Sequence, residues 1–126
     1  MDETVQRTAM AYAAAWNRGD AASIAQLFDT HARHVTPLGS VVRGRVAIGF
    51  AHRLLLEGLF RGTKIALVES SVGVSTHGLV IYRANWQLDT DDAHSGLIVR
   101  SGELAFALFF SSHAWLIADG YSRMTY

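Results

Sequence analysis

The chain has 126 residues, of which half are hydrophobic and 17% are charged, and this favours a folded domain over a disordered segment. Eleven basic and eleven acidic side chains give a formal net charge of zero, which argues against binding to nucleic acid or to an anionic membrane. Because there is no cysteine, disulfides, thiolate nucleophiles and thiolate metal sites are excluded. The start of the chain lacks the features of an export signal and no apolar run is long enough to span a bilayer, so we expect a cytoplasmic protein.

The first third of the chain has the periodicity of helices. One apolar helix face is made by residues spaced four, three and four apart: Val5, Ala9, Tyr12 and Trp16. Gly19 ends this helix and Asp20 caps a second one, which carries a short apolar stripe up to Phe28 and is followed by polar residues up to His34. Pro37 ends the helical pattern, 39–44 is predicted to be a short extended arm, and 46–57 is predicted to be a third helix.

The rest of the chain has the composition of β-strands. We expect strands over 65–74, 79–88, 97–110 and 114–126. His77-Gly78 is predicted to make a tight turn, 89–96 an exposed loop, and Ser101-Gly102 a β-bulge. Helices followed by a meander of strands predict one α+β domain over 1–126, with the helices packed on one face of the sheet.

Several short motifs follow one another along the chain: Tyr12, Ala15-Trp16-Asn17, Asp20, Leu27-Phe28, Ala32, Gly39, Gly44-Arg45, Ile48 and Trp115-Leu116-Ile117. Taken together in this order, they resemble the NTF2-like superfamily, especially its SnoaL-like and DUF4440 (SgcJ/EcaC-type) branches. The resemblance implies a conical half-barrel in which three helices close a strongly curved, mainly antiparallel sheet. It also implies a pocket for a small hydrophobic molecule and a homodimer formed through the sheet. The superfamily includes both enzymes and binding proteins, so the resemblance does not fix the function.

The ketosteroid isomerase branch offers a more specific comparison. Tyr12 matches the tyrosine that this branch uses to stabilise an oxyanion. Its general-base aspartate and its second oxyanion-hole acid fall, however, at Thr36 and Phe106 in this sequence. Since a hydroxyl group does not replace a carboxylate as a base at neutral pH, ketosteroid isomerase chemistry is disfavoured.

Strand alternation gives a set of candidate site residues. If Ile117 faces the pocket, Asp119 and Tyr121 share its face; Asp119 is then the candidate general acid or base, and Tyr12 or Tyr121 the candidate to stabilise developing charge, with no cofactor. The expected pocket lining is Trp16, Thr36, Tyr82, Trp86, Phe106 and Ile117. The structural alternatives are an ion pair between Asp119 and Arg123, a Tyr12 bonded to a backbone group, and tryptophans that only fill the core.

Other readings of the sequence remain open. His31 and His34 have a spacing that could seat a metal, but no third ligand lies at a supporting spacing, so we expect no metal site. Arg83 and Asn85 resemble part of the Arg-x-Asp pair of superfamily epoxide hydrolases, with asparagine in place of aspartate. The rivals to an enzyme are a non-catalytic binding or accessory module and a dimerisation domain whose outward row, Arg83, Asn85 and Gln87, meets a partner sheet.

Overall fold

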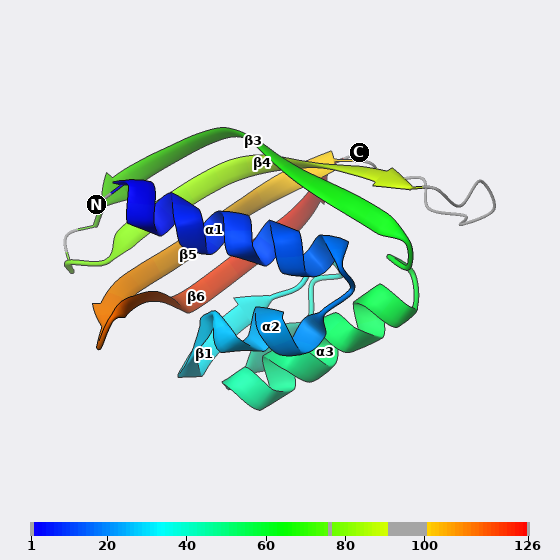
Figure 1. Cartoon of the computed structure of the whole chain (residues 1–126), viewed down its shortest axis with the longest axis horizontal. Helices are drawn as coiled ribbons and strands as arrows, with labels where there is room; N and C mark the ends of the chain where they lie inside the picture. Colours follow the sequence, from blue (N-terminus) through cyan, green and yellow to red (C-terminus); the bar gives the residue numbers. More distant parts are fainter. Residues whose placement is uncertain (1, 76, 91–100, 126) are drawn as a thin grey trace.

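The computed structural model describes residues 2–75, 77–90 and 101–125, which form three helices and six strands (Figure 1). The helices are α1 (Asp2–Asn17), α2 (Ala21–Gln26) and α3 (Arg45–Glu57). The strands are β1 (Phe28–Val35), β2 (Val41–Arg43), β3 (Thr63–Val74), β4 (Val80–Thr90), β5 (Ser101–Ser111) and β6 (Ala114–Thr125). None of these helices is long and apolar enough to cross a membrane.

The strands make one curved sheet in the order β2-β1-β6-β5-β4-β3. Every neighbouring pair is antiparallel except β1 and β6, which run parallel. The helices cover one face: α1 lies across β3, β4 and β6, while α2 and α3 pack together near β1 (Figure 1). The predicted fold class, α+β with helices on one face of a curved and mainly antiparallel sheet, is confirmed.

Helix α1 buries the face that its periodicity predicts. Val5, Ala9, Tyr12 and Trp16 are all at most 3% exposed. Asp20 caps α2 as expected, because its carboxylate accepts a hydrogen bond of 3.0 Å from the backbone N–H of Ser23. Apolar spacing and a capping residue were therefore sufficient to place these two helices.

Strand β1 was not predicted. The second helix is predicted to reach Phe28, with His31 and His34 near its end, whereas α2 ends at Gln26 and both histidines lie on β1. Phe28, Ala32 and His34 are buried in this strand, and His31 is exposed. Hydrogen bonding to β2 on one side and to β6 on the other stabilises an extended conformation that the polar local sequence does not suggest.

A bulge in β6 decides which residues of this strand face the helices. Ala107 pairs with Asp119 while Leu108 pairs with Ile117, so Ala118 is an extra residue and the alternation of side chains reverses there. Ile117 and Ser122 consequently point to the buried side of the sheet, and Asp119 and Tyr121 to the outer side. The bulge predicted at Ser101-Gly102 is wrong, because the ladders on both sides of these residues are continuous.

The other strand predictions are close. Strands β3, β4 and β6 begin or end within two residues of the expected bounds, and the turn predicted at His77-Gly78 joins β3 to β4. Residues 91–100, which include most of the predicted loop over 89–96 and the start of the predicted strand over 97–110, lie outside the described residues.

Two glycines on the inner side of the sheet make room for buried rings. A Cβ atom at Gly102 would collide with the indole of Trp86, its register partner on β4, and with the backbone carbonyl of Arg123. A Cβ atom at Gly120 would collide with Nδ1 of His34. The absence of a side chain at these positions lets Trp86 and His34 lie directly against the sheet.

We predict that Gly102→Ala and Gly120→Ala each lower the free energy of unfolding by about 1–3 kcal/mol, because the added methyl group displaces a ring in a packed core. Urea unfolding followed by circular dichroism measures this loss. Gly73→Ala is the matched control: it also lies on a strand, but nothing stands within 4 Å of its Cβ position, so its stability should change little. Equal stability of the three variants would contradict this account of the two glycines.

Candidate functional site

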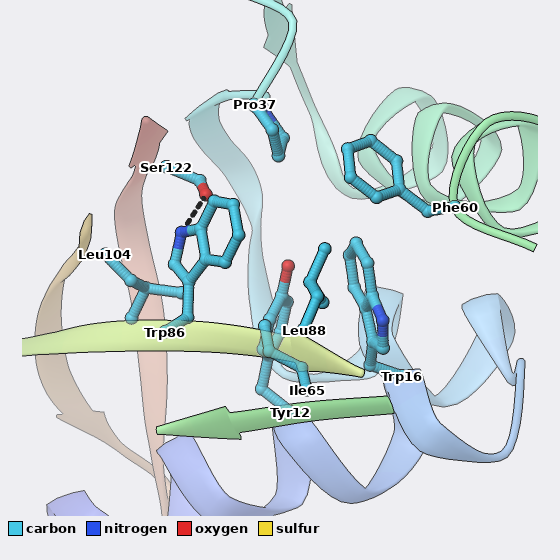
Figure 2. Close-up of a pocket in the computed structure, with 9 residues that line it drawn as sticks. All are labelled: Tyr12, Trp16, Pro37, Phe60, Ile65, Trp86, Leu88, Leu104 and Ser122. Atoms are coloured by element: carbon cyan, nitrogen blue, oxygen red, sulfur yellow. Dashed lines mark hydrogen bonds between the residues drawn. The ribbon is translucent and has the colours of Figure 1, made fainter. Parts of the chain in front are cut away.

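A pocket lies between helix α1 and the concave face of the sheet (Figure 2). Nine residues line it: Tyr12, Trp16, Pro37, Phe60, Ile65, Trp86, Leu88, Leu104 and Ser122. They come from α1, from the loop after β1, from the turn after α3 and from four strands of the sheet. Since seven of the nine carry no polar atom or only an indole N–H, the pocket suits an apolar ligand.

The pocket is narrow in this conformation. Its empty volume is about 240 Å³ including the part that is open to solvent, but the space accessible to the centre of a water molecule is only about 10 Å³. That space is close to the minimum for one water molecule. A ligand the size of an aromatic ring therefore fits only if wall residues move; Pro37 and Phe60 are the wall residues that lie outside the helices and strands.

Both tryptophans of the wall have their N–H groups bonded within the protein. Trp16 donates to Oγ1 of Thr63 at 3.0 Å. Trp86 donates to the carbonyl of Glu103 and to Oγ of Ser122, each at 3.1 Å. These bonds fix the two indoles, so that they offer a ligand aromatic faces and no free donor.

The main polar group at the pocket is the Tyr12 hydroxyl, which points into the space between the aromatic side chains (Figure 2). It is 2.8 Å from Nε2 of His52, and Nδ1 of His52 is 2.9 Å from the backbone carbonyl of Ile48. Tyr12 and His52 are both almost completely buried. The pocket is thus connected through one hydroxyl to an imidazole in the core.

A second buried imidazole lies beside the first. The ring centroids of His34 and His52 are 5.0 Å apart, and the ring of Phe28 packs edge-on against His34. His34 has no exposed surface, and neither of its nitrogens has a hydrogen-bond partner among the described residues. Since neutral imidazole carries one N–H, an unpaired buried donor here costs on the order of 1–3 kcal/mol.

Burial keeps all three groups uncharged near neutral pH. It lowers the pKa of His52 to about 4, although the bond to the Ile48 carbonyl acts in the opposite direction. Burial, and then the neighbouring His52, lower the pKa of His34 well below its ordinary value. Burial also raises the pKa of the Tyr12 hydroxyl. The site is therefore a neutral polar cluster in an apolar core.

The structure places the predicted pocket residues in two groups. Of the six predicted lining residues, Trp16 and Trp86 line the pocket, as does Tyr12, which was predicted to stabilise developing charge. The other four are buried but do not line it: Thr36, Tyr82, Phe106 and Ile117. The ring of Phe106 packs edge-on against the ring of Tyr12, with the ring centroids 5.1 Å apart. Thr36 accepts a hydrogen bond from the backbone N–H of Ser40 and thereby holds the loop that carries Pro37.

The prediction that Asp119 and Tyr121 face the pocket is wrong. The bulge at Ala118 turns both side chains to the outer face of the sheet, where the side chain of Asp119 is 43% exposed and Tyr121 is also exposed. Asp119 forms an ion pair of 2.8 Å with Arg33 across β1 and β6. The alternative pairing of Asp119 with Arg123 is also wrong, because Arg123 pairs with Glu103. A carboxylate bound to arginine on an open surface lacks the apolar surroundings that the catalytic hypothesis assumed.

No role was predicted for His52, and His34 was a candidate only as a metal ligand. His52 lies four residues after Ile48 and three before Leu55, so the apolar periodicity of α3 already places it in the core. His34 could be placed only once β1 is recognised as a strand. His31 and His34 then lie on opposite faces of that strand, and the described residues contain no group of three or more side chains suited to hold a metal.

Comparison with models of protein families finds no match, and no curated protein matches the sequence. Solved structures do match. An uncharacterised protein with a cystatin-like fold from Caulobacter vibrioides has a TM-score of 0.86 at 22% identity, over 99% of this chain and 89% of that chain. A candidate dehydratase of the NTF2-like family from Streptomyces avermitilis has a TM-score of 0.80 at 15% identity, over 98% and 95%. A candidate scytalone dehydratase from Novosphingobium aromaticivorans has a TM-score of 0.78 at 13% identity, over 98% and 83%. The chain therefore has the cystatin-like fold of NTF2-like proteins.

We predict that the protein loses stability as the pH falls from about 6.5 to about 4. In this range the histidines of the unfolded chain take up protons, while His52 in the folded protein stays neutral down to a pKa of about 4. The unfolded state then binds more protons, so the free energy of unfolding falls, for His52 alone by about 3 kcal/mol. Urea unfolding at a series of pH values measures this loss.

Two variants on β1 test whether the buried imidazoles cause the effect. His34→Leu should flatten the pH dependence and raise stability at pH 7, because it removes the unpaired buried N–H. His31→Gln, which changes an exposed residue of the same strand, should behave as the wild type. A pH dependence that His34→Leu leaves unchanged would contradict the role assigned to His34.

Proposed function

We propose that this protein binds a small, planar, hydrophobic molecule in the pocket between α1 and the sheet. The observation that supports this most strongly is the Tyr12 hydroxyl, the polar end of a pocket whose walls are tryptophan, phenylalanine and aliphatic side chains. A few polar groups in an apolar concave site are the usual composition of a small-molecule site. The motif resemblance to the SnoaL-like and DUF4440 branches and the fold shared with candidate dehydratases support the same reading.

The electrostatics favour binding over acid–base catalysis. None of the nine lining residues carries a carboxylate, so a base would have to be the Tyr12–His52 pair. A ligand phenol has an ordinary pKa of about 10, whereas the pKa of His52 is about 4. Transfer of the phenol proton through Tyr12 to His52 therefore has to overcome a difference of about six pKa units. That difference corresponds to about 8 kcal/mol before any attraction between the resulting charges.

Cofactor-independent isomerisation, cyclisation or dehydration is the second candidate function. The observation that favours it is the direct hydrogen bond from a pocket hydroxyl to a buried imidazole, an arrangement able to relay a proton. Catalysis on this basis requires a bound substrate that raises the pKa of His52, for example by placing negative charge next to Tyr12. Turnover that disappears in Tyr12→Phe and persists in Asp119→Asn would favour this candidate.

The ligand-binding proposal predicts different roles for the three tryptophans. A planar aromatic ligand such as 1-naphthol should raise the melting temperature and quench the fluorescence of Trp16 and Trp86, which line the pocket. Trp86→Phe should weaken binding at least five-fold because it removes a wall of the pocket. Trp115→Phe is the matched control, since Trp115 lies outside the pocket and its replacement should leave affinity and quenching in place. Equal loss of affinity in both variants, or no stabilisation by any planar aromatic compound, would overturn the proposal.

We also propose that a second copy of the chain covers the outer face of the sheet. This face has no helix over it (Figure 1), and among the described residues it carries charges of both signs, including Arg33, Arg83, Arg123, Glu69, Glu103 and Asp119. Such a face is electrostatically compatible with a second copy of itself related by a two-fold axis.

The homodimer predicts that charge reversal has different effects at two exposed arginines. Arg83→Glu, in the middle of the outer face, should shift a dimer toward monomer in analytical ultracentrifugation. Arg53→Glu, on the exposed side of α3, should leave the dimer unchanged. A wild-type protein that sediments as a monomer at micromolar concentration would refute the dimer.

A further inference from the structure

The hydrogen bond between Tyr12 and His52 has only one possible direction in this structure. The backbone carbonyl of Ile48 has no proton to donate, so the bond at Nδ1 of His52 requires a proton on Nδ1. Because burial keeps His52 neutral, Nε2 then carries no proton and is an acceptor. Tyr12 must therefore donate its hydroxyl proton to His52.

This direction determines what Tyr12 offers to a ligand. Its only proton is used inside the core, and the lone pairs of its oxygen are what remains for the pocket. An oxygen with free lone pairs and no free proton accepts hydrogen bonds from a ligand hydroxyl. It does not donate one to a ligand carbonyl or oxyanion, which is the opposite of the role that the sequence analysis expected for Tyr12.

Ser122 offers a ligand a hydrogen-bond donor, whereas Tyr12 offers an acceptor. Its Oγ accepts the N–H of Trp86 at 3.1 Å, and the serine hydroxyl proton has no acceptor among the described residues. Ser122 is 6% exposed and lines the same pocket. Both indole N–H groups are occupied, so the polar groups left for a ligand are an acceptor at Tyr12 and a donor at Ser122.

We infer that the pocket selects a phenol-type ligand, an aromatic ring whose hydroxyl donates to Tyr12 and which carries an acceptor oxygen, such as a carbonyl, for Ser122. The aromatic walls bind the ring, and the two polar groups fix its orientation. This inference rests on the proposed binding function and adds the chemical class of the ligand.

Four single-ring compounds test the inference by calorimetry. 4-Hydroxyacetophenone has both polar groups, 4-ethylphenol lacks the acceptor, acetophenone lacks the hydroxyl, and 4-acetylbenzaldehyde replaces the hydroxyl with a carbonyl acceptor. We expect 4-hydroxyacetophenone to bind at least ten-fold more tightly than acetophenone or 4-acetylbenzaldehyde, since these leave the lone pairs of Tyr12 without a donor. Tyr12→Phe should remove the advantage of the hydroxyl, and Ser122→Ala the advantage of the ketone.

The outcomes separate the inference from the binding function. If 4-acetylbenzaldehyde binds more tightly than acetophenone while 4-hydroxyacetophenone does not, Tyr12 donates, and the inference is wrong although the pocket binds ligand. If none of the four compounds nor 1-naphthol binds, the binding function fails and the inference fails with it.

A measurement without ligand tests the direction of the bond itself. Long-range ¹H–¹⁵N correlation spectra distinguish the two tautomers of neutral histidine, and His52 should carry its proton on Nδ1 at pH 7. Tyr12→Phe should shift the Nε2 resonance of His52 and leave that of exposed His31 unchanged. A proton on Nε2 would overturn the inference.

Discussion

The site depends on the buried hydrogen bond between Tyr12 and His52. It joins α1 to α3 across 40 positions of the sequence, in a core of aromatic and aliphatic side chains where an unpaired hydroxyl or imidazole would be destabilising. The bond from Nδ1 of His52 to the Ile48 carbonyl fixes the tautomer of His52, so the Tyr12 hydroxyl donates to Nε2 and the oxygen of Tyr12 remains an acceptor at the pocket. One interaction thus stabilises the packing of two helices and determines the chemistry that the pocket offers.

The architecture could be predicted because it follows from local patterns. The spacing of Val5, Ala9, Tyr12 and Trp16, the cap at Asp20 and the branched residues of the later strands each specify their element. Strand β1 could not be predicted in this way. Its sequence is polar and lacks a clear alternation, and it is extended because β2 and β6 supply hydrogen bonds from distant parts of the chain.

The candidate site was predicted in part, and the misplacement of Asp119 and Tyr121 has one physical cause. Tyr12, Trp16 and Trp86 lie on regular elements, so periodicity places them correctly at the pocket. Asp119 lies two residues beyond Ile117, where simple alternation gives the inner face, but the extra residue Ala118 reverses it. A bulge depends on how two strands pair, and no local feature of the β6 sequence indicates it. His52 is a different case, because the apolar periodicity of α3 is sufficient to predict that His52 lies in the core.

The most direct test of the account is a crystal structure of the protein with 4-hydroxyacetophenone bound. The account predicts the ring between Trp16 and Trp86, its hydroxyl within hydrogen-bond distance of the Tyr12 oxygen, and displacement of Pro37 or Phe60 to admit it. A ligand bound instead on the outer face beside Asp119 and Arg33, with the space under α1 still closed, would contradict it.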